Sequence, residues 1–479
     1  MRKTKIIATL GPSTDDPEIL RSMLTSGLDV ARFNFSHGDH VSHKERINSI
    51  RKICKVTETT VALMADTKGP EIRLDVFRDR KAELVAGNTF TLTTDTVVGD
   101  ASRASISYAN LPHEVSPGAR ILLDDGLIEL SVESVSGANI TTRVTIGGII
   151  SDRKGVNVPG IRLDIPYISA KDRSDLRFFV ENGFDLIAAS FVRSSDDISE
   201  MREELHRIDS SNKLKIIAKI ENAEGVKNAD SILAASDGLM VARGDLGVEL
   251  AYEELPIIQK DLIKKALSRG KSVITATQML ESMINSSRPT RAETSDVANA
   301  IFDGTGAIML SGETAMGKYP VESLAAMASI AERIERSIDY RLVFSQSRYN
   351  TESSITNAIS HATVTTAHDL QTAAILTVTM SGDTARNVAK YRPVCPIIAC
   401  TPSPVTQRQL KLVWGVIPLL TKEEADTTAL FNQAIDMSLA GGYIKEGDLV
   451  VLTAGIPVGY SGTTNMLKVH VVGEKILGA

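Results

Sequence analysis

Two carboxylates that follow consecutive apolar segments could together hold one hard divalent cation. Glu221 comes directly after Ile216–Ile220, and Asp245 comes three residues after the next apolar segment. Mg²⁺ in proteins commonly takes one or two carboxylates and completes its coordination with substrate oxygens and water. Salt bridges to the neighbouring Lys219 or Arg243 would explain the same carboxylates, so their spacing leaves both interpretations open.

Lys219 lies two residues before Glu221 in a run of apolar residues. Because side chains alternate along a strand, the two side chains should point to the same face. A fixed ammonium beside a bound metal could stabilise the equatorial oxygens of a transferring phosphoryl group. A lone lysine at a strand end is also a common surface charge, which is the simpler interpretation of this residue.

A second group of polar residues follows two earlier apolar segments. Arg32, Asn34 and Ser36 lie at the end of one, and Asp66 and Thr67 lie at the end of the next. The guanidinium could grip two phosphate oxygens as a fork. The other four side chains offer neutral oxygens and one negative charge, which suits a weakly held monovalent cation. A network of hydrogen-bonded turns would account for them as well.

Further polar side chains stand at segment ends and would join the same site if those ends converge. Gly244, between Arg243 and Asp245, would allow close approach of the backbone to a ligand. The remaining candidates are His37, Lys68, Arg73, Ser190, Thr277, Gln278, Ser311 and Glu313.

The elements that must position these residues are short apolar runs alternating with amphipathic segments of helix length. Continuous hydrophobicity indicates strands buried on both faces, as in a parallel sheet covered by helices. Eight such units predict a closed (β/α)₈ TIM barrel whose strand ends meet at one mouth, although an open doubly wound sheet would also alternate. The expected strands are Lys5–Leu10, Val30–Phe35, Val61–Ala65, Leu186–Phe191, Ile216–Ile220, Gly238–Ala242, Val273–Thr277 and Ala307–Leu310. The expected helices are Asp16–Ser26, Asp39–Lys55, Lys171–Asn182, Ser195–Ile208, Glu224–Ala235, Tyr252–Arg269, Ala292–Asp303 and Val321–Ser337.

Residues 70–164 interrupt this rhythm with period-two alternation and turn residues. Glu83–Thr93 and the pair Arg120–Leu123 and Leu127–Val135, joined through Asp124-Asp125-Gly126, indicate strands and a hairpin. We expect a small inserted β domain at the carboxyl ends of the barrel strands. It could be a lid over the mouth or an insertion without a role in catalysis.

A separate unit begins after Arg341. Its alternating helices and strands predict an open α/β domain over residues 345–479. The loop Thr377–Arg386 joins a strand to a helix, and there Ser381, Thr384 and free helix N–H groups could hold a phosphate. Capping of that helix by Ser381 or Asp383 would explain the same residues.

Composition excludes several classes of protein. A net charge of −6 gives no general attraction to nucleic acid or to an anionic membrane. Three cysteines without a close pair support neither a disulfide framework nor a structural zinc site. Because the apolar run near Met1 ends at Gly11-Pro12, and no stretch reaches about 20 apolar residues, we expect a soluble cytoplasmic protein.

Ten segments, in order along residues 1–340, resemble the pyruvate kinase family. They are Lys3–Gly11, Asp29–Gly38, Ala65–Arg73, Lys154–Gly160, Ile217–Gly225, Met240–Glu249, Ala276–Met283, Arg288–Asp296, Asp303–Gly304 and Met309–Tyr319. The resemblance implies a catalytic TIM barrel (1–69 and 165–340), an inserted small β-barrel domain (70–164) that acts as a lid, and a C-terminal effector-binding domain (345–479).

The resemblance also implies an activity. The phosphoryl group of phosphoenolpyruvate would move to ADP, giving pyruvate and ATP in the last step of glycolysis, with Lys219, Arg32 and Thr277 as catalytic residues. Phosphoenolpyruvate would lie against Arg32, Lys219, Gly244, Asp245 and Thr277. The nucleotide would contact Arg73, Lys154, Asn34 and His37. Mg²⁺ or Mn²⁺ would bind Glu221 and Asp245, and K⁺ would bind Asn34, Ser36, Asp66 and Thr67.

Three finer expectations rest on the same resemblance. Family members that need K⁺ carry a glutamate at the position of Glu71, which predicts K⁺ dependence, whereas Leu74 replaces their usual threonine. Relatives regulated by fructose 1,6-bisphosphate have a basic residue at the position of Asp383, so we expect a different effector, a sugar monophosphate or AMP, with Gly459–Asn465 as the facing loop. The family further suggests a homotetramer.

Two other classes of function fit parts of the pattern. A metal-dependent aldolase or lyase acting on pyruvate enolates shares a barrel and a Glu/Asp metal pair, but it would not explain the insertion or the Arg73 and Lys154 pair. A non-catalytic metabolite-binding regulator should show damage among four residues, and all four are intact: Lys219, Glu221, Asp245 and Thr277.

Overall fold

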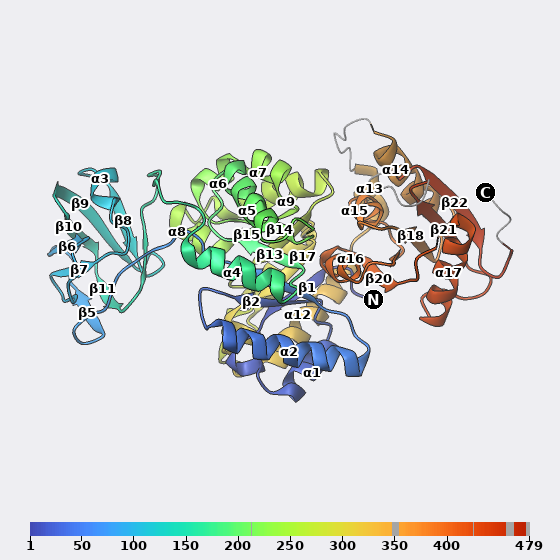
Figure 1. Ribbon diagram of the computed structural model, residues 1–479, viewed down its shortest axis with the longest axis horizontal. Helices are drawn as coiled ribbons and strands as arrows, with labels where there is room; N and C mark the ends of the chain where they lie inside the picture. The colour runs from blue at the N-terminus through green and yellow to red at the C-terminus, as the bar shows by residue number, and fades with distance from the viewer. Residues whose placement is uncertain (212, 347–353, 425, 457–463, 476–479) are drawn as a thin grey trace.

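A closed barrel forms the centre of the molecule. The computed structural model describes residues 1–211, 213–346, 354–424, 426–456 and 464–475. Figure 1 shows the inserted β domain and the C-terminal domain at opposite ends of the barrel. Across these residues, no helix is both long enough and apolar enough to cross a membrane.

Eight parallel strands close the barrel in the order β1-β17-β16-β15-β14-β13-β3-β2. The prediction of a closed barrel is therefore confirmed, and the open doubly wound alternative is wrong. Strand β13 ends at Ala189 rather than at the expected Phe191, because Phe191 adopts a left-handed backbone conformation (φ 53°) that turns the chain. The strands are β1 (Lys5–Thr9), β2 (Val30–Asn34), β3 (Ala62–Asp66), β13 (Leu186–Ala189), β14 (Lys215–Ile220), β15 (Gly238–Ala242), β16 (Ser272–Ala276) and β17 (Ala307–Leu310).

Helices cover the outside of the barrel. The expected helix Glu224–Ala235 is wrong as a single element, because Asn228 ends one helix and begins the next. The helices are α1 (Pro17–Thr25), α2 (His40–Thr57), α4 (Ala170–Glu181), α5 (Ser195–Ile208), α6 (Ala223–Lys227), α7 (Ala229–Ala235), α8 (Arg243–Glu249), α9 (Leu255–Ser268), α10 (Arg291–Phe302), α11 (Gly312–Ala315) and α12 (Pro320–Glu335), with 3₁₀ turns at Pro12–Thr14 and Glu281–Ile284.

Alternation along β14 explains how this strand serves both the core and the mouth. Ile216, Ala218 and Ile220 pack in the layer between strands and helices. Ile217 instead packs inside the barrel, in a cluster to which the other strands also contribute. Lys219 follows Ile217 by two residues and therefore also points inward, as predicted.

The insertion has its own core and two layers of strands. A seven-stranded sheet of order β4-β12-β8-β9-β10-β6-β7 lies with a two-stranded ribbon, β11-β5. The expected strand Glu83–Thr93 is two strands, separated by a turn that contains Gly87 (φ 87°). The hairpin at Asp124–Gly126 is present. The elements are β4 (Ile72–Arg73), β5 (Lys81–Leu84), β6 (Thr89–Thr93), β7 (Arg103–Ser105), α3 (Leu111–Glu114), β8 (Arg120–Leu123), β9 (Ile128–Ser136), β10 (Asn139–Ile146), β11 (Gly148–Ser151) and β12 (Gly155–Asn157).

The C-terminal domain is an open five-stranded sheet of order β20-β19-β18-β21-β22, in which only β22 runs antiparallel. The predicted open α/β architecture is confirmed. The elements are α13 (Tyr340–Gln346), α14 (Ile355–Asp369), β18 (Ala374–Val378), α15 (Asp383–Ala389), β19 (Ile397–Thr401), α16 (Pro404–Gln409), a 3₁₀ turn at Leu410–Leu412, β20 (Val416–Leu420), α17 (Thr427–Ala440), β21 (Leu449–Ala454) and β22 (Met466–Val471).

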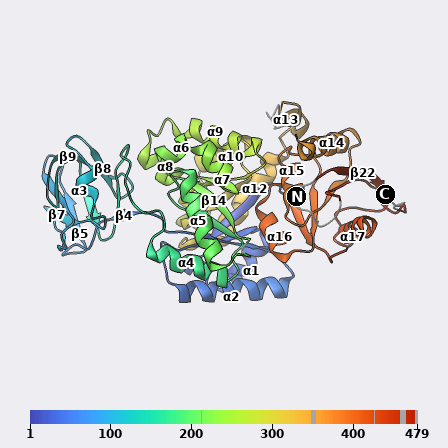
Figure 2. The ribbon, with the colours of Figure 1, turned by 45° about the horizontal axis from the view of Figure 1, so that its top comes forward.

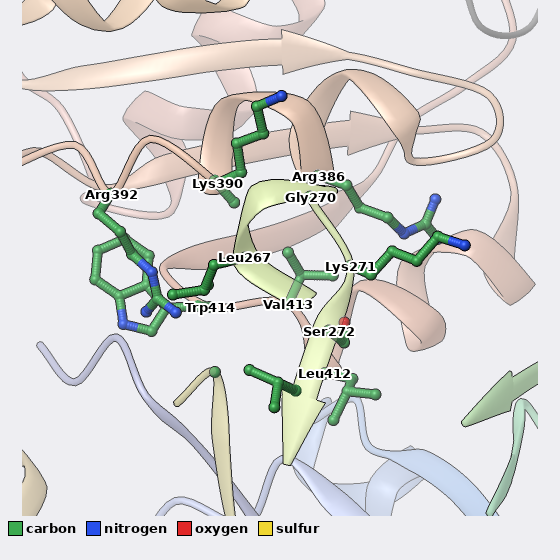
Figure 3. A pocket seen from close by; sticks show the side chains of 13 residues that line it. Leu267, Gly270, Lys271, Ser272, Arg386, Lys390, Arg392, Leu412, Val413 and Trp414 are labelled. Atoms are coloured by element: carbon green, nitrogen blue, oxygen red, sulfur yellow. The ribbon is translucent and has the colours of Figure 1, made fainter. Parts of the chain in front are cut away.

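The C-terminal domain packs on the amino ends of the barrel strands, and in the turned view of Figure 2 α16 lies at this junction. Asp185, fully buried just before β13, accepts hydrogen bonds from the backbone N–H of Leu63 (2.9 Å) and from Nε of Arg408 on α16 (2.8 Å). Nearby, Figure 3 shows Arg392 beside the ring of Trp414, with its guanidinium carbon 4.3 Å from the ring centroid. Lys3 of the barrel also lies over the Trp414 ring, with its Nζ 5.2 Å from the centroid, so polar and cation–π contacts join the two domains.

Replacing Asp185 by Asn should change how stability depends on pH. Burial raises the pKa of Asp185 to about 6, although Arg408 and the Leu63 N–H oppose this shift. The folded protein therefore holds an extra proton between about pH 4 and pH 6 and loses stability as the pH rises through that window. Asn does not titrate, so the variant escapes this loss. The difference in free energy of unfolding, variant minus wild type, should therefore increase by about 3 kcal/mol between pH 4 and pH 7. Denaturant unfolding of both proteins measures this, and a constant difference would contradict it.

Candidate active site

A cavity of about 940 Å³ lies between the carboxyl ends of the barrel strands and the insertion. This volume is in the range of small-molecule sites. Residues from both domains line it, including His37, Glu71, Arg73, Asp124, Lys154, Phe191, Asn222, Asp245 and Glu249. The cavity therefore lies at the barrel mouth where the sequence predicted an active site.

Lys219 is the centre of a buried ionic cluster at this mouth. Its Nζ lies 2.8 Å from Oε1 of Glu221 and 3.1 Å from Oδ1 of Asp66, and it donates to Oγ of Ser190 at 2.9 Å. Burial disfavours its charge, but Asp66, Glu221 and Asp245 outweigh this effect and raise the pKa of Lys219. The side chain is thus a permanent, fixed ammonium in a largely water-excluded position.

Glu221 has the environment of a metal ligand. Its Oε2 accepts from the backbone N–H of Phe191 at 2.6 Å. Its Oε1 is buried, and within the described chain no donor is aligned to hydrogen-bond with it, although Lys219 is close. Burial raises the pKa of Glu221, Lys219 opposes the shift, and the nearby negative charge of Asp245 adds to it. A cation between the two carboxylates would relieve this repulsion, so the pair fits Mg²⁺ or Mn²⁺.

The metal pair has only two carboxylates. Over the described ranges, no group of three or more His, Cys, Asp and Glu side chains is arranged to hold a metal ion. Two carboxylates leave coordination positions for substrate oxygens and water, which is the usual arrangement for Mg²⁺ at phosphate-transfer sites.

Asp66 anchors both cations of the mouth. Arg32 donates from Nε to Oδ2 of Asp66 (2.7 Å) and from Nη1 to Oγ1 of Thr9 (2.7 Å). Burial works against the Asp66 charge, but Arg32 and Lys219 outweigh it and hold the pKa of Asp66 below its usual range. Asp66 therefore stays ionised and fixes the guanidinium and the ammonium relative to each other.

The four residues expected at a monovalent cation lie at or just after the ends of the neighbouring strands β2 and β3. Asn34 and Asp66 are directly paired in the register of β2 and β3. The Oδ1 of Asn34 accepts from the Ser36 N–H at 3.0 Å, and Oγ1 of Thr67 accepts from the Ser190 N–H at 3.0 Å. These hydrogen bonds form the turn network, and they leave further lone pairs on the same oxygens for a weakly held ion.

Thr277 is held in an uncommon backbone conformation. It has a φ of 68° and the following Gln278 has a φ of 53°. Its Oγ1 accepts from the Gly244 N–H at 2.8 Å, and its carbonyl accepts from Nη2 of Arg243 at 2.8 Å. Two consecutive left-handed non-glycine residues are costly, and such strain is typical of functional sites. The geometry joins Thr277 to the start of α8, which carries Asp245.

The expected nucleotide cations face the cavity, but each is already paired. Nε of Arg73 donates to Oε2 of Glu71 at 2.7 Å, and Nζ of Lys154 lies 2.8 Å from Oδ1 of Asp124. His37 lines the same cavity and is exposed. Three of the four expected nucleotide residues thus line one cavity, with carboxylates at the two cations where phosphate oxygens would bind, whereas Asn34 is not among the lining residues.

The expected effector loop precedes α15. The helix is preceded by Gly382, which makes no side-chain cap, so the alternative that Ser381 or Asp383 caps it is wrong. Instead, Oγ of Ser381 donates to Asp383 at 2.7 Å, and the hydroxyls of Thr384 and Thr464 lie 2.9 Å apart. Of the expected facing loop Gly459–Asn465, residues 459–463 lie outside the described residues.

Three features of the mouth had no assigned role from the sequence. Ser190 bridges Asp66 and Lys219, the Phe191 N–H orients Glu221, and Arg243 orients Thr277. Ser190 and Arg243 were found only as polar residues at strand ends. The contact made by a backbone N–H leaves no signal in residue type.

Comparisons with known proteins agree with this geometry. Residues 1–324 match the family model for the pyruvate kinase barrel domain, and residues 357–470 match the model for the pyruvate kinase alpha/beta domain. The fold resembles the crystal structure of a pyruvate kinase from Cryptosporidium parvum, with a TM-score of 0.92, 39% identity, and coverage of 98% of this chain and 96% of that one.

Similarity to curated sequences extends over nearly the whole chain. The pyruvate kinases of Sporosarcina psychrophila and Geobacillus stearothermophilus are each 50% identical to it, over 99% of this chain and 81% of theirs. That of Clostridium acetobutylicum is 47% identical over 98% of this chain and 100% of its own. The chain belongs to the pyruvate kinase family.

Proposed function

We propose that the chain transfers the phosphoryl group of phosphoenolpyruvate to ADP, giving pyruvate and ATP. The observation that carries this proposal is the position of Lys219, a buried ammonium between Asp66 and Glu221, with Arg32 fixed on the same Asp66. Phosphoryl transfer asks a protein mainly to position the reactants and to neutralise charge on the transferring oxygens. Two fixed cations beside a carboxylate pair that fits a metal meet both requirements.

The chain's own residues would divide this work. Arg32 and Lys219 would contact the phosphate of phosphoenolpyruvate, while Gly244, Asp245 and Thr277 would hold the rest of the molecule. The strained turn at Thr277, braced by Arg243, supports a positioning role because it is ordered by hydrogen bonds from α8. Mg²⁺ or Mn²⁺ at Glu221 and Asp245 would supply Lewis-acid neutralisation of substrate oxygens.

The nucleotide would enter from the side of the insertion. Arg73 and Lys154 are paired with Glu71 and Asp124, so phosphate oxygens of ADP would have to replace carboxylates as their partners. Asn34 and His37 would complete this subsite. The contact of Lys154 with the β8–β9 hairpin supports the proposed role of the insertion (70–164) as a lid.

A coupled assay tests the activity. Pyruvate formation from phosphoenolpyruvate should require ADP and Mg²⁺, and should increase strongly with K⁺. Release of pyruvate without ADP would favour the aldolase or lyase alternative. No turnover under any of these conditions would favour the regulator.

The K⁺ requirement should depend on Glu71. Members of the family that do not need K⁺ carry a lysine at the position of Glu71, so replacing Glu71 by Lys should supply a fixed ammonium in place of the free monovalent cation. We expect activity measured without K⁺ to rise about tenfold or more, since a fixed charge is then always present. Activity with and without KCl, at constant ionic strength set by a tetraalkylammonium salt, measures this. Equal stimulation of variant and wild type by K⁺ would contradict it.

Regulation and assembly follow the family. A sugar monophosphate or AMP would bind the C-terminal domain (345–479) near Ser381 and Thr384, where the Asp383 carboxylate, paired with Arg386, disfavours a bisphosphate. The barrel (1–69 and 165–340) would associate into a homotetramer. Titration of activity with each effector, and the mass of the protein in solution, test these two statements.

A further inference from the structure

A second large cavity, of about 490 Å³, lies at the opposite end of the barrel from the mouth. Its walls come from α2, from the start of β3 and from α16 of the C-terminal domain. A volume of this size can hold a metabolite of a few carbons. The lining residues are Ile50, Arg51, Cys54, Thr59, Thr60, Val61, Leu63, Gly183, Gln407 and Arg408.

Two guanidiniums from different domains line this cavity, and in the part of the chain that the structure describes only one of them is paired with a carboxylate. Arg408 of α16 donates from Nε to Asp185 at 2.8 Å. Arg51 of α2 donates from Nη2 to the backbone carbonyls of Asn182 and Gly183. Over the described ranges, no carboxylate oxygen lies within 4 Å of the Arg51 guanidinium. The cavity therefore carries an excess of positive charge.

The charges around the cavity act on one another. Burial lowers the pKa of Arg51, the positive charge of Arg408 lowers it further, and Asp185 acts in the opposite direction. Burial also raises the pKa of the Cys54 thiol, while the positive charge of Lys411 opposes this shift. Two cations thus line a space in which an anion would relieve their repulsion.

A smaller cavity at the same junction between the barrel and the C-terminal domain differs from this one in size. The space of about 30 Å³ drawn in Figure 3 is also surrounded by cations, but these have protein partners. Lys271 donates to carbonyls at the end of α7, Arg386 pairs with Asp383, and Lys390 donates to Asn357. That cavity is too small for an anionic metabolite, whatever the charge around it.

We propose that the cavity between α2 and α16 binds a small phosphorylated metabolite, with Arg51 and Arg408 holding its phosphate. Guanidiniums bind phosphate as forks, and a dianion matches two cations better than a carboxylate does. Free inorganic phosphate offers the same chemistry, but it would leave most of the volume empty.

Its position would let this site influence the mouth. Leu63 lines the cavity and lies on β3, whose other end carries Asp66, the anchor of Arg32 and Lys219. Arg408 belongs to the C-terminal domain, so one ligand would touch both domains. This site is distinct from the loop of Ser381 and Thr384.

Alkylation of Cys54 by iodoacetamide, followed by mass spectrometry, reports on this cavity alone. We expect glycerol 3-phosphate, at ten times its dissociation constant, to slow Cys54 modification about tenfold. KCl at equal ionic strength should not slow it, and Cys395, outside the cavity, should react at an unchanged rate. Inorganic phosphate should protect more weakly at equal concentration. Equal protection by inorganic phosphate would overturn the metabolite as ligand, and equal rates with glycerol 3-phosphate and KCl would overturn the site.

Substitutions at neighbouring positions of α2 test whether Arg51 binds the phosphate. Arg51→Gln should abolish protection by glycerol 3-phosphate. Lys52→Gln, which removes the same charge from the next residue of the helix but does not line the cavity, should keep protection. Arg51→Lys retains the charge without the fork and should show intermediate protection. Protection that is the same in Arg51→Gln and wild type would overturn the assignment.

Discussion

Turnover of the Lys219→Met variant should fall by about 10³-fold or more, with KM changed much less. The ammonium faces developing charge on the phosphoryl oxygens, so its loss acts mainly in the transition state. The variant should also lose about 3 kcal/mol of stability, because Glu221 and Asp66 lose a buried partner. Steady-state kinetics and denaturant unfolding measure the two effects.

Lys215→Met is the matched control. Lys215 lies at the other end of the same strand, 3.1 Å from Asp237, and its side chain is partly exposed. The turnover of the Lys215→Met variant should stay within about threefold of wild type, because this surface ion pair lies far from the reacting groups. The Lys219→Met protein should still bind Mg²⁺, since both carboxylates remain and a competing cation is gone. Near-normal turnover of Lys219→Met would contradict the assignment of Lys219 as the group that stabilises the transition state.

Much of the barrel could be predicted because parallel strands leave a clear signal. Both faces of each strand are buried, so β15 and β17 appear as continuous apolar runs with the observed bounds. Strand ends were less certain. The predicted strand extended too far at β13 because Phe191 is apolar and common in strands, whereas in the structure it has a left-handed φ and its N–H contacts Glu221. That contact joins residues far apart in sequence.

Contacts between residues far apart in sequence also limited the prediction of the active site. Alternation placed Lys219 and Glu221 on one face, because a strand's geometry is local. The pairing of Arg73 with Glu71 and of Lys154 with Asp124 depends on how the insertion folds, and no pattern of residue types encodes it. Ser190 was recognised as a polar strand end, but its bridge between Asp66 and Lys219 required the closed barrel, in which β13 lies between β3 and β14.

Mg²⁺ activation of the Glu221→Gln variant should require a concentration about 10- to 100-fold higher than in wild type. The amide keeps the shape of the side chain and can still accept from the Phe191 N–H, but one of the two negative charges at the metal pair is removed. Glu249→Gln is the control, since Glu249 lines the same cavity on the helix that carries Asp245. Its Mg²⁺ requirement should stay within about threefold of wild type.

Measurements of stability distinguish a loss of Mg²⁺ binding in Glu221→Gln from damage to the fold. Burial, with a contribution from Asp245, raises the pKa of Glu221 from 4.5 to about 8, so without metal the protein loses stability as the pH rises through this range. The metal-free Glu221→Gln protein should therefore be at least as stable as wild type at pH 8, yet gain less stability when Mg²⁺ is added. Thermal unfolding with and without Mg²⁺ tests both statements. A variant that is destabilised without metal and stabilised by Mg²⁺ as strongly as wild type would show that Glu221 supports the fold and does not hold the ion.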